Sequence, residues 1–208
     1  MWNMTDIRIE SVSDPFSDPA PARLAARVLA FAATAGLLGE RPIRALDAGV
    51  WKMVLTGLRK AGLAGTTPLT AAGSSRPAAF ARELERLYEA IEDSPLPRFE
   101  WEPMRRLFGD ESLAALLGVS RPSLQRYASG ERNTPQEVAE RLHVLSLVAS
   151  DLAGSYNDFG IRRWFERPRD PLGSRSPSQV LRPGWGPDDP MVARVRSLAA
   201  ALVSSAAT

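Results

Sequence analysis

Apolar residues recur at helical spacing along this chain, in segments that prolines and glycines interrupt. The clearest case is residues 77–92, whose apolar stripe consists of Phe80, Leu84, Leu87, Tyr88 and Ile91. No window of the chain alternates between apolar and polar residues as a half-buried strand would. The pattern therefore predicts an all-α protein.

The same periodicity places the helices and three candidate domains. We expect helices at 21–38, 50–63, 77–92, 101–107, 112–117, 121–128, 135–153, 157–166, 176–182 and 190–204. Residues 11–21 and 64–77 are rich in turn-forming residues and predict an extended lead-in and a flexible linker. The expected domains are an N-terminal helical region at 1–97, a helical bundle at 98–154 and a small helical domain at 155–208.

Two helix starts carry the signature of a capping box, in which an N-cap hydroxyl and a Glu or Gln three residues later satisfy each other's backbone donors. One is Thr134 with Glu137, and the other is Ser176 with Gln179. Asp189 followed by Pro190 gives the last helix a cap and a first-turn proline. These signals concern structure and not function.

Composition excludes several classes of site. The 208 residues contain no cysteine and a single histidine, so a disulfide framework, a thiolate metal site or a Ser-His-Asp triad is not expected. His143 lies in an apolar helix and is expected to be structural. No paired-carboxylate, phosphate-loop or metal-ligand spacing is present, so we expect no enzyme, no metal and no cofactor.

The start of the chain is mixed and charged, unlike a targeting segment. The longest apolar stretch, 28–38, is shorter than the roughly 20 residues that a membrane span needs. We therefore expect a soluble cytoplasmic protein with no membrane contact.

The net charge is only +2, so charge alone does not indicate a nucleic-acid partner. Of the 26 basic residues, only Lys52 and Lys60 are lysines. Arginines gather in residues 160–182, which hold six of them against two acidic residues.

Residues 112–134 combine two short predicted helices with a tight turn. Gly118 supplies the backbone freedom of that turn, and Ser120 is placed to cap the second helix. Ala114 is small enough for the second helix to cross close over it. The core between the two helices is expected to consist of Leu113, Leu117, Val119 and Leu124.

The order of Leu113-Ala114, Gly118-Val119-Ser120 and Gly130 resembles the Xre-like helix-turn-helix over about 101–150. In such a module the N-terminal part of the second helix enters the major groove of DNA. The resemblance therefore implies DNA contacts, to bases or phosphates, from Ser120, Arg121, Ser123, Gln125, Arg126, Arg132, Asn133 and Thr134. Arginine suits guanine and glutamine suits adenine, while the loop after the helix suits phosphates. The alternative is a helical hairpin with a solvated face and no nucleic acid.

A second motif covers about 155–204. Its ordered features are Trp164-Phe165, Pro168, Leu172-Gly173, Arg175, Pro177, Leu181, Gly184 and a final amphipathic helix. With the first motif, this order resembles the Xre/MbcA/ParS antitoxin family, in which a toxin-binding domain follows the DNA-binding module. Residues 183–190 look like a longer turn than that family usually has, and residues 1–97 have no counterpart in short antitoxins.

The resemblance implies a type II antitoxin that binds operator DNA, represses its own operon and blocks a RES-domain toxin. NAD would be the substrate of that toxin and not a cofactor of this chain. A homodimer or a larger hetero-oligomer with the toxin is expected. The residues expected to contact the partner are Trp164, Arg167, Arg169, Arg175 and Trp185, because large aromatic residues and arginine are enriched at protein interfaces.

Other interpretations stay open at this stage. Trp164 could instead belong to the core of its own domain, together with Leu172, Leu181, Val195 and Leu198. The arginines could contact DNA phosphates. The chain could be a stand-alone transcription regulator that uses the C-terminal domain for self-association. Residues 1–97 could dimerise, fold over the other domains or bind something else; support or oligomerisation is the simplest role.

Overall fold

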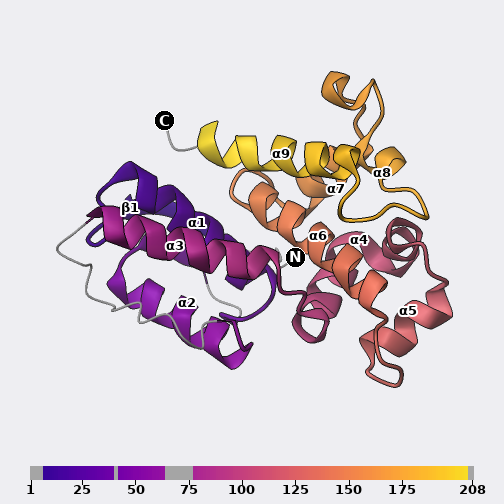
Figure 1. Ribbon diagram of the computed structural model, residues 1–208, viewed down its shortest axis with the longest axis horizontal. Coiled ribbons are helices and arrows are strands. Elements are labelled where there is room, and N and C mark those ends of the chain that lie inside the picture. The colour runs from indigo at the N-terminus through magenta and orange to yellow at the C-terminus, as the bar shows by residue number, and fades with distance from the viewer. Residues whose placement is uncertain (1–6, 40–41, 64–76, 206–208) are drawn as a thin grey trace.

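The computed structural model describes residues 7–39, 42–63 and 77–205, and these residues are mostly helical (Figure 1). In chain order the elements are β1 Ile7–Val12, α1 Pro19–Thr34, β2 Ile43–Leu46, α2 Ala48–Lys60, α3 Pro77–Glu92, α4 Pro97–Leu117, α5 Arg121–Ala128, α6 Gln136–Ala153, α7 Asp158–Glu166, the 3₁₀ turn η1 Asp170–Leu172, α8 Pro177–Val180 and α9 Pro190–Ser205. Apart from Pro77, the linker expected at 64–77 lies outside the described residues. None of the described helices combines the length and apolarity that crossing a membrane requires.

Two short strands correct the expectation of an all-α fold. β1 and β2 pair in parallel, with Ile7 opposite Ile43 and Val12 opposite Leu46, and the register shifts between Ile7 and Ser11. The search for alternating apolar and polar residues misses these strands, because β2 has only four residues and most side chains of β1 are exposed. The fold is mainly α with one small parallel sheet.

The N-terminal lobe consists of the described residues up to Leu96 and has its own core. Val28 and Phe31 of α1, Trp51 of α2 and Leu84 of α3 are buried together in it. Phe16 is fully buried and packs edge-on against Trp51, with ring centroids 5.4 Å apart. The segment expected to be an extended lead-in therefore folds back into this core after β1.

The C-terminal lobe, residues 97–205, has a second core that is continuous. It contains Trp101 of α4, Leu124 of α5, Leu145 of α6, Trp164 of α7 and Val195 of α9. The domain boundary expected at 154/155 lies inside this core, so residues 98–154 and 155–202 do not pack as separate units. A cut at that boundary would expose the apolar faces of α6 and α9.

Capping signals explain most helix starts in this lobe. Ser120 Oγ accepts a hydrogen bond from Ser123 N (3.3 Å), and α5 begins where the sequence predicts. The capping box predicted at Ser176 is confirmed. The helices predicted at 101–107 and 112–117 lie on either side of a break at Gly109 within α4, where the backbone is not helical (φ +74°, ψ 157°).

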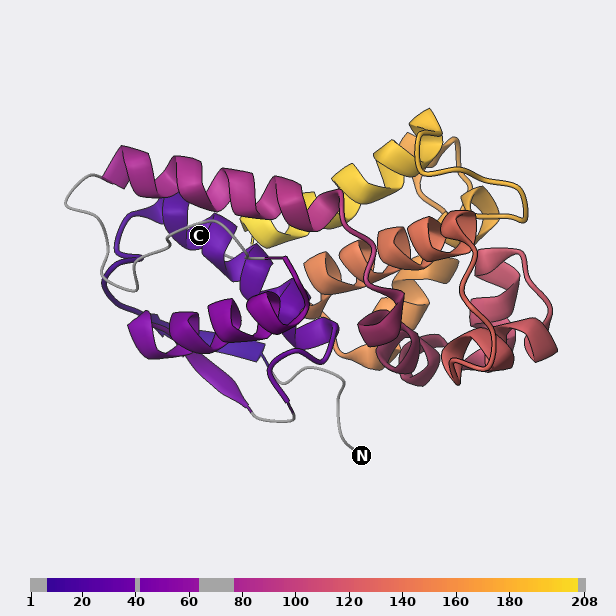
Figure 2. The same cartoon turned by 60° about the horizontal axis from the view of Figure 1, so that its bottom comes forward.

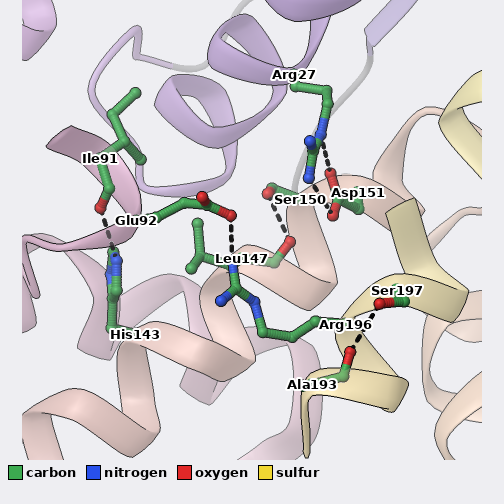
Figure 3. Close-up of polar contacts among 10 residues, drawn as sticks. All are labelled: Arg27, Ile91, Glu92, His143, Leu147, Ser150, Asp151, Ala193, Arg196 and Ser197. Carbon is green, nitrogen blue, oxygen red and sulfur yellow. Dashed lines mark hydrogen bonds and ion pairs between the residues drawn. The ribbon is translucent and has the colours of Figure 1, made fainter. Parts of the chain in front are cut away.

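Polar contacts tie the two lobes together around α6, as Figure 3 shows. Arg27 of α1 donates two hydrogen bonds to Asp151 of α6, at 3.0 and 3.1 Å. Arg196 of α9 pairs with Glu92 at the end of α3. Leu147 of α6 packs into the N-terminal core. The lobes are therefore held in one arrangement by ion pairs as well as by apolar packing.

Burial sets the electrostatics of the Arg27–Asp151 pair. Burial raises the pKa of the Asp151 carboxyl, and the hydrogen bonds and charge of Arg27 only partly oppose this. The pKa of Arg27 is raised, because its hydrogen bonds with Asp151 and the nearby negative charge outweigh the opposing effect of burial. The Arg27 guanidinium also lies over the Tyr88 ring, 4.1 Å from its centroid.

Candidate functional site

The turn between α4 and α5 fixes how α5 is presented. Gly118 ends α4 with a φ of +70°, and Val119 N donates to Ala114 O at 3.0 Å. A side chain at position 118 would also lie 3.4 Å from the backbone of Pro183. That distance is an ordinary van der Waals contact, so it is the left-handed conformation that explains the glycine. Ala114 is buried beside this turn, as the sequence predicts.

Helix α5 has one buried face and one exposed face. Leu124 and Tyr127 are buried in the C-terminal core, and Tyr127 stacks on Trp101 with ring centroids 6.3 Å apart. Arg121, Gln125 and Arg126 are exposed. The three long polar side chains predicted to read DNA therefore lie together on the surface of a helix that the core holds from behind.

The two serines at the start of α5 serve the helix itself. Ser120 Oγ donates to Ser123 Oγ at 2.9 Å and accepts from Ser123 N. Ser123 is half-buried and Ser120 is exposed. The Ser120 hydroxyl is thus engaged in capping α5.

An acidic residue that the sequence did not single out, Asp110, lies against this face. Arg105 donates to both of its carboxylate oxygens, at 2.8 and 3.1 Å, and Gln125 Nε2 donates to Oδ2 at 3.4 Å. The hydrogen bond from Arg105 lowers the pKa of Asp110, and the Gln125 contact and the charge of Arg121 act in the same direction. Asp110 therefore orients the Gln125 amide. In the sequence, the glycine before Asp110 is the one feature that could have drawn attention to this position.

The loop after α5 exposes two of the three residues that the sequence predicts to contact DNA. Arg132 and Asn133 are exposed, and the Arg132 guanidinium lies 5.5 Å from the Tyr127 ring centroid. Thr134, however, is half-buried and accepts a hydrogen bond from Trp101 Nε1 at 3.0 Å. Thr134 lies one residue before the N-cap position of α6 and does not cap that helix. The N-cap position is Pro135, so the predicted capping box is wrong.

The two tryptophans predicted to contact a partner are core residues, and this corrects the sequence analysis. Trp164 is 2% exposed and Trp185 is 4% exposed. Trp185 Nε1 donates to Leu116 O at 2.8 Å, and Trp185 O accepts from Arg141 Nε at 2.8 Å. Trp164 faces inward with Phe165. The alternative that Trp164 belongs to the core is confirmed.

The arginines predicted to contact a partner differ in their solvent exposure and in their contacts with the rest of the chain. Arg167 is exposed, and Arg175 is exposed with Nε donating to Leu172 O at 3.3 Å. Arg169 is half-buried, with its guanidinium 4.4 Å from the Trp164 ring centroid. Burial lowers the pKa of Arg169. Arg167 and Arg175 therefore remain available at the surface, whereas Arg169 mainly covers Trp164.

Two exposed aromatic residues were missed by the sequence analysis. Phe159 is 63% exposed and Tyr156 is 40% exposed. Gly160 lets the Tyr156 ring approach α7, since a Cβ there would lie 3.0 Å from that ring. Phe159 and Arg163 are four residues apart, on the face of α7 opposite Trp164. Helical spacing from the Trp164-Phe165 pair could have identified this face.

The only histidine is structural, as predicted. His143 is 2% exposed, and its Nε2 donates to Ile91 O at 2.8 Å. Its Nδ1 lies 2.5 Å from Oε1 of the fully buried Glu100, so the two side chains are hydrogen-bonded to each other. This pair joins α6 to α4 and to the end of α3. Within the described ranges, no group of three or more acidic or histidine side chains is placed to hold a metal ion.

The chain was also compared with known proteins. Protein-family models, curated proteins and solved structures gave no match. The functional proposal below therefore rests on the exposed faces of α5 and α7 and on the sequence motifs.

Proposed function

We propose that the chain is a DNA-binding antitoxin that represses its own operon and neutralises a cognate RES-type toxin by direct binding. The exposed face of α5 carries the proposal: Arg121, Gln125 and Arg126 project from a short helix anchored by Leu124 and Tyr127. A helix fits the major groove, where arginine can donate two hydrogen bonds to guanine and glutamine can pair with adenine. The partner of this face is double-stranded operator DNA.

Contacts to phosphates would set the position of α5 on the duplex. Arg132 and Asn133 extend the exposed face beyond the end of the helix. Arginine and backbone N–H groups at a helix start are common phosphate donors, and they fix register without reading sequence. Proteins with this geometry usually bind as dimers, so we expect two half-sites about 34–36 Å apart.

The toxin would bind the exposed side of α7 and the segment that follows it. Phe159 and Tyr156 supply apolar contact area, and Arg163, Arg167 and Arg175 supply positive charge around it. Aromatic residues and arginine are the side chains that dominate binding energy at protein interfaces. This surface replaces Trp164 and Trp185 as the contact to be tested.

DNA binding is tested by a mobility shift with duplexes selected from a random-sequence library. The double variant Arg121→Ala/Arg126→Ala should bind the selected duplex at least tenfold more weakly, since each bidentate base contact is worth about 1–3 kcal/mol. Arg82→Ala/Arg86→Ala on the outer side of α3 is the matched control and should bind as the wild type does. Equal affinity for both double variants would contradict the role of α5.

Toxin neutralisation is tested by co-expression with the toxin encoded by a neighbouring gene. Phe159→Glu/Arg167→Glu should fail to neutralise while still binding DNA, and Arg121→Ala/Arg126→Ala should neutralise normally. Deleting residues 155–208 is a poor test, because α7 and α9 supply part of the core on which α5 rests. A chain that binds DNA but has no toxin partner would instead be the stand-alone regulator.

A further inference from the structure

A second cationic surface lies in the N-terminal lobe, on α2. This helix carries Lys52, Arg59 and Lys60 and no acidic residue. All three are exposed, and none of them forms an ion pair with another of the described residues. The nearest acid in sequence, Asp47, is engaged in accepting a hydrogen bond from Val50 N at 2.8 Å. The outer face of α2 is therefore uniformly positive.

Spacing aligns these charges along one side of the helix. Lys52, Thr56 and Arg59 follow at i, i+4 and i+7, and Lys60 is next to Arg59. The opposite side of α2 is buried against the N-terminal core. Gly57 allows a close approach to the chain after α1, since a Cβ there would lie 2.8 Å from Leu37 O. The row formed by Lys52, Arg59 and Lys60 therefore lies on a helix that is packed firmly against the core, with its charges exposed to solvent.

Helix α2, which carries the row, lies on the same side of the molecule as α5. In Figure 1, α2 is the lowest helix of the N-terminal lobe and α5 lies at the lower edge of the C-terminal lobe. When that side is turned forward, as in Figure 2, both helices come to the front. The Arg27–Asp151 and Glu92–Arg196 pairs hold the lobes in this arrangement.

We propose that Lys52, Arg59 and Lys60 contact the phosphates of the same DNA duplex that α5 reads, in the segment flanking the sequence under α5. The inference rests on the proposed DNA-binding function and gives the N-terminal lobe a role in it. Complementary charge selects the occupant: a duplex carries one negative charge per about 1.7 Å of its axis. Lysine is a compact point charge that suits a phosphate without demanding a fixed geometry.

The outer face of α3, the other long helix at the surface of this lobe, does not share this character. On the outer side of α3, Arg82 and Arg86 alternate with Glu85 and Glu89. A face with mixed charges attracts DNA weakly, because the fields of its positive and negative side chains largely cancel at the phosphates. The row on α2 is therefore the surface of this lobe that fits DNA.

The test compares two duplexes that the wild type selects from a random library: the selected site alone, and the site with about one helical turn, roughly 10 bp, added on each side. The variant is Lys52→Gln/Arg59→Gln/Lys60→Gln, and Arg82→Gln/Arg86→Gln is the control. Affinity is measured by fluorescence anisotropy across a salt titration. A plot of log K against log salt concentration has a slope of about −0.9 for each neutralised phosphate. The magnitude of that slope on the long duplex should therefore decrease by up to about 2.7 in the triple variant.

On the short duplex, the triple variant and the wild type should bind alike, and base preference should be unchanged on both. An unaltered slope on the long duplex overturns the proposal. A slope reduced equally on both duplexes overturns the flanking position. If the triple variant binds DNA normally but loses toxin neutralisation, the row belongs to a protein interface and the proposal is wrong. A wild type that selects no sequence overturns the DNA-binding function itself, and this inference with it.

Discussion

Replacing Trp185 by Phe distinguishes a core tryptophan from an interface tryptophan. In the structure, Trp185 Nε1 donates to Leu116 O at 2.8 Å, in the last turn of α4, where carbonyls lack a partner within the helix. The Phe variant keeps an aromatic ring but leaves that buried carbonyl without a donor. The change therefore removes one hydrogen bond and also makes the buried aromatic side chain smaller, and both effects destabilise the folded state.

The expected loss follows from this geometry. An unsatisfied buried polar group costs about 1–3 kcal/mol, so we take about 2 kcal/mol for this site. For a chain of this size, about 2 kcal/mol lowers Tm by roughly 4–8 °C. Urea unfolding followed by far-UV circular dichroism measures the free energy directly. Phe159→Ala, at an exposed position, is the control and should change stability by no more than about 0.5 kcal/mol.

An interface role for Trp185 makes the opposite prediction. In that case Trp185→Phe would leave the free energy of unfolding within about 0.5 kcal/mol of the wild type and would weaken only partner binding. That result would refute the continuous core of the C-terminal lobe. It would also support the contact between Trp185 and a partner protein that the sequence predicts.

Two further predictions concern buried and partly buried charges. Arg27→Met leaves the Asp151 carboxylate without its cation and should cost about 3 kcal/mol in urea unfolding, whereas Arg27→Met/Asp151→Leu should recover most of that loss. The hydrogen bond from Arg105 lowers the pKa of Asp110 below 3.8 in the folded state. As pH falls from 3.8 towards that lowered pKa, the unfolded state therefore binds more protons than the folded state does. The stabilisation is therefore present above about pH 3.8 and is lost as pH falls through the lowered pKa of the folded state. An NMR titration should show the lowered pKa in the wild type and its return towards 3.8 in Arg105→Gln, and an unchanged pKa would contradict the ion pair.

Local signals in the sequence predicted most helices, because each helix buries a regular stripe. The ranges expected for α3 and α5 match the structure, since α3 has a clean amphipathic pattern and α5 starts at a serine cap and ends near Gly130. The two strands were missed because they are short: β1 alternates only over its first four residues, and β2 has four residues in all.

The remaining errors share one physical cause, which is competition from distant partners. Thr134 resembles an N-cap locally, but its hydroxyl oxygen accepts a hydrogen bond from an indole 33 residues earlier in the chain and makes no cap to α6. Trp185 resembles an exposed anchor, but a carbonyl 69 residues earlier accepts its N–H. Asp110 acquires its role only because Gln125 folds back to it across the turn. No local pattern reports such contacts.

The most direct test of the central claim is the set of DNA sequences that the chain selects from a random duplex library. The account predicts one enriched motif for the wild type, and loss of an adenine preference at a single position in Gln125→Ala. Loss of a guanine preference is predicted for Arg121→Ala. A wild type that enriches no motif, or variants that select the same motif as the wild type, would contradict it.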